Sequence, residues 1–336
     1  MGRLVTGSGT GTGTGSGPAR RIVFVAPNPS IDRLIEVDAI TAGAIHRPDV
    51  VLALPGGKGL NAARAAFALG GRVTVVSIVA GRAGDWIEER LAAIGVEATV
   101  VRDEAGRETR TCLSVLDRST GRLTEFYEPG EGIGPTAWAS LEDAIVSELE
   151  AGDIGAVVCC GSLPIGAPTD GYARIVRMAQ GRSVRTVVDG HGLPLLAALK
   201  AQPSVVKVNA AEAGEATGMS SAEPVELGRA LVRGGAGQVI VTLGADGAVA
   251  CERESAWRLS SPAPVGAYPV GSGDAFVGGL AVALVEGASL LDAARGGIAA
   301  GSANALVRGA GHLDAETAHR LVETVKVVPI RSEDGN

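Results

Sequence analysis

Short apolar runs alternate with longer helical patterns over most of this chain. Strands that alternate with helices at this spacing are typical of a mostly parallel sheet with helices on both faces. We therefore predict an α/β protein. Runs typical of buried strands lie at residues 22–26, 73–79, 154–160, 186–188, 205–209 and 239–242.

Polar side chains gather where these predicted strands end. Open α/β sheets place their ligand sites at the carboxyl ends of the strands, so such residues are candidates for a binding site. Each of them also fits an ordinary turn. The residues in question are Asp32, Ser162, Asp189, Asn209 and Thr242.

A hairpin pattern interrupts the alternation of strands and helices. Two alternating runs, 109–117 and 122–128, flank a turn that contains Gly121. This arrangement predicts a small β appendage, which would serve as a lid over the site. Arg110 lies on the first run and either faces the site or is solvated.

A glycine-rich loop precedes an apolar helical pattern near the C-terminus. Gly271, Ser272 and Gly273 stand directly before Asp274, and the helical pattern runs on to residue 285. Backbone N–H groups at a helix N-terminus favour an anion, and the glycines would allow unusual dihedrals and a close approach of phosphate. Asp274 would then take a proton from an alcohol that attacks phosphorus. The alternative is an Asp that only caps the helix.

A second glycine-rich element lies far upstream. Residues 55–71 read PGGKGLNAARAAFALGG, an alanine-rich helix that begins in a glycine loop and ends at a glycine pair. The spacing is not that of a Walker A loop. Gly57, Lys58 and Asn61 nevertheless stand at the loop and first turn, where a cation and an amide can meet a ligand. Otherwise Lys58 and Asn61 are surface groups.

Composition and charge exclude several classes of partner. The net charge of −7 argues against nucleic acid, and no apolar run approaches the ~20 residues that span a membrane. The four cysteines lack metal-ligand spacing and are expected to be buried, reduced thiols of a cytoplasmic protein. Residues 1–20 contain GSGTGTGTGSG, which we interpret as a disordered leader, a cloning remnant or a misplaced start.

Taken together, these segments resemble a known family. GGKGLNAARAAFALGG and YPVGSGDAFVGG are similar to the two signatures of PfkB/ribokinase-type carbohydrate kinases, and VKVNAAEAGEATG and VTLGADGAVA resemble its middle motifs. The resemblance implies a three-layer ribokinase-like fold with a small β-sheet lid. It further implies a single kinase domain over 21–331, with lid segments near 32–55 and 107–130 and a tail at 332–336.

The nearest branch resembles the hexose-phosphate kinases, and it implies roles for individual residues. The sugar and its existing phosphate would be bound by Asp32, Arg47, Gly57, Lys58, Asn61, Arg110 and Ser162. The nucleotide would be bound by Lys207, Asn209, Thr242, Gly244, Gly247 and Asn304. Asn209 and Glu212 would position Mg²⁺ indirectly, together with ATP. Gly271, Ser272 and Gly273 would form the anion hole, and Asp274 would be the base.

The chain departs from the pattern of that branch in three places. Val208 replaces a usual proline, and Gly190-His191 replaces a Ser or Thr with Ser. Tyr268-Pro269 stands where a Ser/Asp-Thr type pair is usual. The first two departures bear on nucleotide and sugar contacts.

The resemblance therefore implies ATP-dependent, in-line phosphorylation of a phosphorylated ketohexose to a bisphosphate. Fructose 1-phosphate, fructose 6-phosphate and tagatose 6-phosphate are the candidate substrates. Two alternatives stay open: a kinase of an unphosphorylated sugar or nucleoside, and a non-catalytic sugar-phosphate sensor. Activation by K⁺ and a homodimer formed through the lid are also left open.

Overall fold

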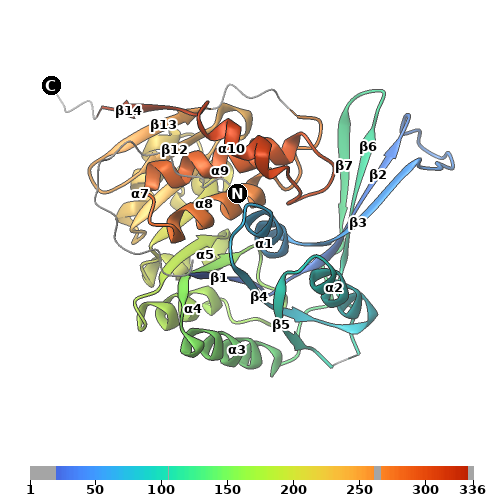
Figure 1. The fold of residues 1–336 in the computed structure, drawn as a ribbon, viewed down its shortest axis with the longest axis horizontal. Coiled ribbons are helices and arrows are strands. Elements are labelled where there is room, and N and C mark those ends of the chain that lie inside the picture. The colour runs from blue at the N-terminus through green and yellow to red at the C-terminus, as the bar shows by residue number, and fades with distance from the viewer. Residues whose placement is uncertain (1–19, 105, 261–265, 332–336) are drawn as a thin grey trace.

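A ten-stranded sheet forms the centre of the molecule (Figure 1). The computed structural model describes residues 20–104, 106–260 and 266–331. Neighbouring strands are parallel from β5, at one edge of the sheet, as far as β11. The three remaining pairs, β11–β12, β12–β13 and β13–β14, are antiparallel. In spatial order the strands are β14 (Lys326–Ile330), β13 (Ala256–Ser260), β12 (Ala248–Cys251), β11 (Gln238–Thr242), β10 (Val205–Asn209), β9 (Arg185–Asp189), β8 (Ile154–Cys160), β1 (Arg21–Ala26), β4 (Val73–Val79) and β5 (Glu97–Arg102).

Helices cover both faces of this sheet, as predicted. One face packs against α1 (Lys58–Ala68), α2 (Gly81–Ala93), α8 (Ser272–Val285), α9 (Leu290–Ala305) and α10 (Ala315–Val322). The other face packs against α3 (Ala137–Ala151), α4 (Gly171–Gln180), α5 (Gly192–Lys200), α6 (Ala210–Thr217) and α7 (Pro224–Arg233).

The core is built from aliphatic and small residues, because aromatic residues make up only 3% of the chain. Small residues let helices approach closely. A Cβ atom at Gly279 of α8 would lie 2.6 Å from the Gly296 carbonyl oxygen of α9. This close contact fixes α8, and with it the loop at its N-terminus.

A separate four-stranded sheet, here called the lid sheet, projects from the body (Figure 1). Its strands β2 and β6 pair in parallel, whereas its two outer pairs are antiparallel. The predicted hairpin is thereby confirmed as two of its strands. In spatial order the strands are β3 (Val50–Gly56), β2 (Ser30–Val37), β6 (Thr111–Asp117) and β7 (Arg122–Tyr127).

The sequence did not predict every element. We assigned no strand to β3, β5, β13 or β14 and no helix to α3, α7 or α10. The strands β5 and β14 are the edges of the large sheet, and none of their side chains is fully buried, so neither needs a long apolar run.

The remaining predictions concern the two ends of the chain, the cysteines and membrane-spanning segments. Of the predicted leader, only residue 20 is described, and the predicted tail at 332–336 is not described. All four cysteines lie among the described residues and are buried and unpaired. Within the described ranges, no helix is long and apolar enough to cross a membrane.

Candidate active site

A cavity of about 380 Å³ lies between the lid sheet and the carboxyl ends of β1 and β8. This volume suits a small ligand. The cavity brings together residues that are far apart in the sequence. The predicted site residues that line it are Asp32, Gly57, Lys58, Asn61, Arg110, Ser162, Gly271 and Asp274.

The loop before α8 presents Asp274 to this cavity. Gly271, not Asp274, is the N-cap of α8, and its φ of 82° is left-handed. A Cβ atom at Gly271 would lie 2.5 Å from the Ala310 Cα, so a larger residue does not fit there. The expectation of unusual dihedrals at Gly273 is wrong, because Gly273 lies inside the helix without a positive φ. A Cβ atom at Gly273 would lie 3.2 Å from Lys207 Nζ.

The pKa of Asp274 is raised, as the role of a candidate general base requires. Burial raises the pKa of Asp274 from 3.8 to about 7, although Lys58 and a hydrogen bond from Asn61 oppose the rise. A base with a pKa near the working pH accepts a proton efficiently and is still ionised in a large fraction of molecules.

Asn61 joins Asp274 to Asp32. Its Nδ2 group donates to Asp274 Oδ2 at 3.0 Å and to Asp32 Oδ2 at 3.1 Å. Asp32 also accepts from Ser30 Oγ at 2.6 Å and from the Gly57 backbone N–H at 3.3 Å. The predicted sugar-binding residues are therefore held beside the candidate base.

A buried carboxylate, Asp189, organises the lysines. Lys58 Nζ donates to Asp189 Oδ1 at 3.3 Å and to Glu212 Oε1 at 3.1 Å, and Lys207 Nζ donates to Asp189 Oδ2 at 3.0 Å. Burial opposes ionisation of Asp189, but Lys207 and Lys58 hold its pKa below the usual value. Sequence reasoning noted Asp189 only as a polar residue at a strand end. Its position at the end of β9, beside β10, was the available signal.

Arg110 and Ser162 contribute to the cavity lining from the start of the lid hairpin and from the loop after β8. Arg110 donates to the backbone oxygens of Asn28 and Glu128, each at 3.3 Å, and Asn28 Nδ2 donates to Ser162 Oγ at 3.0 Å. Arg47 is not brought to this place. It is exposed in the segment between β2 and β3 and does not line the cavity.

The predicted nucleotide residues lie outside the cavity lining. Thr242 ends β11, and Gly244 and Gly247 bracket the short turn before β12. Asn304 is fully buried, and its Nδ2 donates to the backbone oxygens of Val270 at 3.0 Å and Tyr268 at 3.4 Å. Asn304 thus holds the loop before α8, while contact of these four residues with a nucleotide stays a prediction.

The predicted magnesium residues form the N-terminus of α6. Asn209 Oδ1 accepts from the Glu212 N–H at 2.8 Å, and Glu212 Oε2 accepts from the Asn209 N–H at 2.9 Å. The described residues contain no cluster of three or more His, Cys, Asp or Glu side chains that would hold a metal alone. One carboxylate fits Mg²⁺ that arrives with ATP, because such Mg²⁺ takes most of its ligands from phosphate and water.

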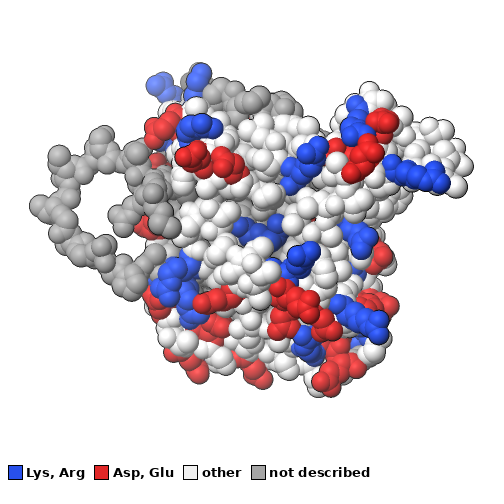
Figure 2. Space-filling view, turned by 45° about the vertical axis from the view of Figure 1, so that its right-hand side comes forward, with Lys and Arg blue, Asp and Glu red and all other residues white. Residues whose placement is uncertain are grey.

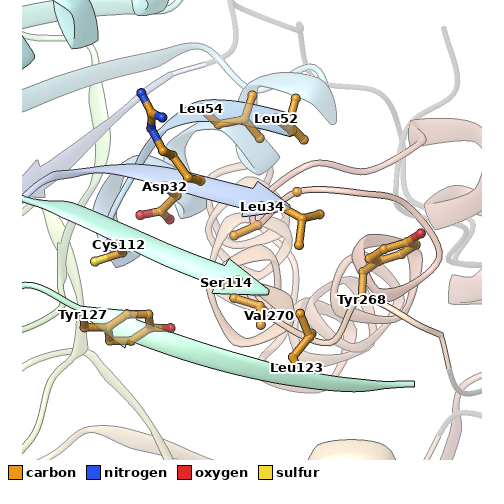
Figure 3. Close-up of a pocket in the computed structure, with 13 residues that line it drawn as sticks. Asp32, Leu34, Leu52, Leu54, Cys112, Ser114, Leu123, Tyr127, Tyr268 and Val270 are labelled. Carbon is orange, nitrogen blue, oxygen red and sulfur yellow. The ribbon is translucent and has the colours of Figure 1, made fainter. Parts of the chain in front are cut away.

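A narrower apolar groove continues from the cavity along the inner face of the lid sheet. Figure 3 shows Leu34 and Leu123 on lid strands and Val270 on the loop before α8, all of which line this groove. Near the C-terminal end of β2, the buried Glu36 carboxylate accepts from Tyr268 Oη at 3.1 Å and pairs with Arg308. This contact ties the lid sheet to the body.

The surface charge agrees with a small-molecule site. Figure 2 shows acidic and basic side chains interspersed over the face that it presents, without a broad basic surface. Nothing on that face suggests binding of a polyanion such as nucleic acid.

This chain is similar to known proteins over most of its length. A profile described as pfkB family carbohydrate kinase matches residues 26–318. The 1-phosphofructokinase of Rhodobacter capsulatus is 33% identical over 278 residues, which cover 82% of this chain and 87% of that protein. The ATP-dependent 6-phosphofructokinase isozyme 2 of Escherichia coli (strain K12) is 34% identical over 260 residues, which cover 76% of this chain and 82% of that protein.

The fold is likewise shared with solved structures. Phosphofructokinase-2 from Escherichia coli in complex with fructose-6-phosphate has a TM-score of 0.81 and 29% identity, and the alignment covers 90% of this chain and 98% of that one. The same enzyme in complex with potassium has a TM-score of 0.82, with 29% identity and the same coverage.

Proposed function

Because the chain belongs to the pfkB family of carbohydrate kinases, we propose that it phosphorylates a ketohexose that already carries a phosphate. The chain is a phosphotransferase, and its named relatives are sugar-phosphate kinases. The candidate substrates are fructose 1-phosphate, fructose 6-phosphate and tagatose 6-phosphate, with ATP as the donor. The observation that carries the proposal is the position of Asp274, which lines the cavity at the start of α8 and accepts a hydrogen bond from Asn61.

The proposed mechanism is direct in-line transfer. Asp274 accepts the proton of the attacking sugar hydroxyl, while Asp32 and Asn61 fix the sugar beside it. N–H groups in the first turn of α8 face the transferred phosphoryl group, because the first turn of a helix lacks internal acceptors for them. Lys207, held next to Gly273 by Asp189, adds positive charge near the same helix end.

Arg110, Asn28 and Ser162 are proposed to hold the substrate's existing phosphate. The guanidinium group suits this role because it donates in a fork that matches phosphate oxygens. Lys58 contributes less than the resemblance implies, since two of its three donors are already directed at Asp189 and Glu212. The pairing of Lys58 with Asp189 and Glu212 is the one observation that favours an unphosphorylated sugar as the substrate. The assay must therefore include an unphosphorylated sugar.

Magnesium would enter with ATP and neutralise charge on the phosphates. Asn209 and Glu212 would hold it, as their position at the start of α6 allows. We also propose that the activity depends on K⁺. The only support for this proposal is the potassium complex of the Escherichia coli enzyme. Omitting K⁺ from the assay tests this point.

We further propose that a second copy of the chain covers the outer face of the lid sheet. Val51 and Phe126 are large apolar side chains of this sheet, and they are 60% and 59% exposed. Apolar area of this kind is typical of an interface. Light scattering that gives a monomer mass at micromolar concentration would contradict a dimer.

A substrate panel tests the proposed function. Wild-type protein is assayed with Mg·ATP and each of the three sugar phosphates, and with free fructose, free tagatose and a nucleoside. We expect at least one sugar phosphate to have the highest kcat/KM. Preference for a free sugar or nucleoside would replace the proposal with the first alternative. Tight binding of a sugar phosphate without any turnover would favour the sensor.

A further inference from the structure

Arg64 is a buried cation directly behind the candidate active site. It lies on α1, one turn after Asn61, and only 6% of the residue is exposed. Its Nη2 group donates to Asn61 Oδ1 at 2.8 Å and also to the backbone oxygen of Ala310. Sequence analysis assigned no role to Arg64, because it is a single arginine among the alanines of the helix.

The contact with Arg64 determines which way the Asn61 amide points. An Asn side chain has one acceptor oxygen and one donor NH₂ group. Because Arg64 can only donate, it holds the oxygen, so the NH₂ group faces Asp32 and Asp274. In the flipped orientation the amide oxygen would face two carboxylates and the NH₂ group would face a guanidinium. Both contacts would then be repulsive.

Charge supports the same arrangement. Burial lowers the pKa of Arg64 to about 10, while the carboxylates of Asp32 and Asp274 oppose the change. Arg64 is therefore still cationic at neutral pH. Burying a guanidinium is costly, and a side chain that only filled space would be apolar. Here the buried charge faces two carboxylates of the site.

The second hydrogen bond of Arg64 reaches the segment behind the loop of α8. Ala310 packs against Gly271, where a Cβ atom would have no room. One guanidinium group thus connects Asn61 with the backbone that supports the N-cap of α8.

We propose that Arg64 is a positioning residue for phosphoryl transfer, which fixes the Asn61 amide so that it links the base Asp274 to the sugar-binding Asp32. This inference rests on the proposed function, because it assigns those two roles to the carboxylates. Arg64 itself touches neither the sugar nor the transferred group.

A double-mutant cycle separates positioning from a structural role. Arg64→Met keeps the length of the side chain and removes its donors, and kcat is measured in the wild-type and Asn61→Ala backgrounds. We expect Arg64→Met to lower kcat roughly 10- to 100-fold when Asn61 is present, as the loss of a charged hydrogen bond would. In the Asn61→Ala background we expect a change under about 3-fold, since no amide is left to orient. Equal losses in both backgrounds would overturn the inference.

The pH dependence of kcat/KM gives a second readout. The hydrogen bond from Asn61 lowers the pKa of Asp274. A misaligned amide removes that effect, so the acid limb of the profile should move to higher pH in Arg64→Met. The matched control is Arg21→Met, which removes another largely buried arginine, paired with Glu148 at 2.9 Å. Arg21→Met should lower the free energy of unfolding without shifting the acid limb of the kcat/KM profile. If the acid limb is also unshifted in Arg64→Met, the result contradicts a positioning role for Arg64.

Two further measurements keep the inference testable if Arg64→Met does not fold or if the protein has no measurable turnover. If Arg64→Met is not native, Arg64→Lys replaces it in the cycle, and the criterion of coupling to Asn61 is unchanged. The Asn61 side-chain NH₂ signal in NMR needs no turnover: its protection from exchange should be lost in the Arg64 variant and kept in Arg21→Met. Retained protection would overturn the inference. A wild-type protein without turnover on any sugar would instead refute the proposed function.

Discussion

Replacing Asp274 with Asn should stabilise the fold while it removes catalysis, and the stabilisation should grow with pH. The physical reason is the pKa of Asp274, which burial raises from 3.8 to about 7. Between these two values the folded protein keeps a proton that the unfolded chain has already lost. Stability therefore falls as pH rises through this window, and above pH 7 the folded state carries a partly desolvated, ionised carboxylate. An Asn side chain does not titrate and avoids this cost.

The size of the effect follows from the window. From pH 5 to pH 7 the folded protein holds one more proton than the unfolded chain, and each pH unit is worth about 1.4 kcal/mol. Asp274→Asn should thus gain about 3 kcal/mol of stability relative to wild type when the pH is changed from 5 to 8. In the same variant kcat should fall by ~10²–10⁴-fold, as for loss of a general base.

Urea unfolding of both proteins at pH 5 and pH 8 measures this difference. Asp314→Asn is the control, because Asp314 caps α10 and its pKa is lowered by hydrogen bonds from Thr317. Asp314 is ionised in both states above its unfolded pKa, so its replacement should change stability equally at pH 5 and pH 8. If Asp274→Asn also shifts stability by the same amount at both pH values, Asp274 does not have a raised pKa and the assignment of the base is refuted.

Two further predictions concern the loop of α8 and the lid contact. Gly273→Val should lower kcat at least ~100-fold with native circular dichroism, because its side chain would displace Lys207 and block phosphate; unchanged kinetics would show that this turn does not bind ATP. Glu36→Gln should raise KM for the sugar and lower the free energy of unfolding by about 1–2 kcal/mol, since it weakens bonds with Tyr268 and the half-exposed Arg308; an unchanged KM would show that this contact does not position the lid.

The sequence predicted the parts of this molecule whose signal is local. The buried parallel strand β1 has a continuous apolar run over residues 22–26, and the loop of α8 combines small residues with one carboxylate in a short stretch. Edge strands such as β5 and β14 were missed because a half-exposed strand does not need an apolar run.

Contacts between distant residues were not predictable in this way. Asp189 is separated from Lys58 by 131 positions, and nothing near Asp189 in the sequence indicates that it pairs with that lysine. Arg64 looks like any helical arginine until α1 is placed against the segment at Ala310. Arg47 shows the opposite case, because a resemblance to a motif assigned it to the site while the structure leaves it exposed in the lid.

The claim that the substrate carries a phosphate is tested most directly by Arg110→Ala. The variant is assayed with the best sugar phosphate and with the corresponding free sugar, and Arg122→Ala, an exposed arginine on β7, is the control. Losing one charged hydrogen bond to phosphate should lower kcat/KM for the sugar phosphate roughly 10- to 100-fold, with KM for ATP and the control variant little changed. For the free sugar, which leaves no charge unpaired, the loss should be much smaller. An equal loss for both sugars would contradict the account.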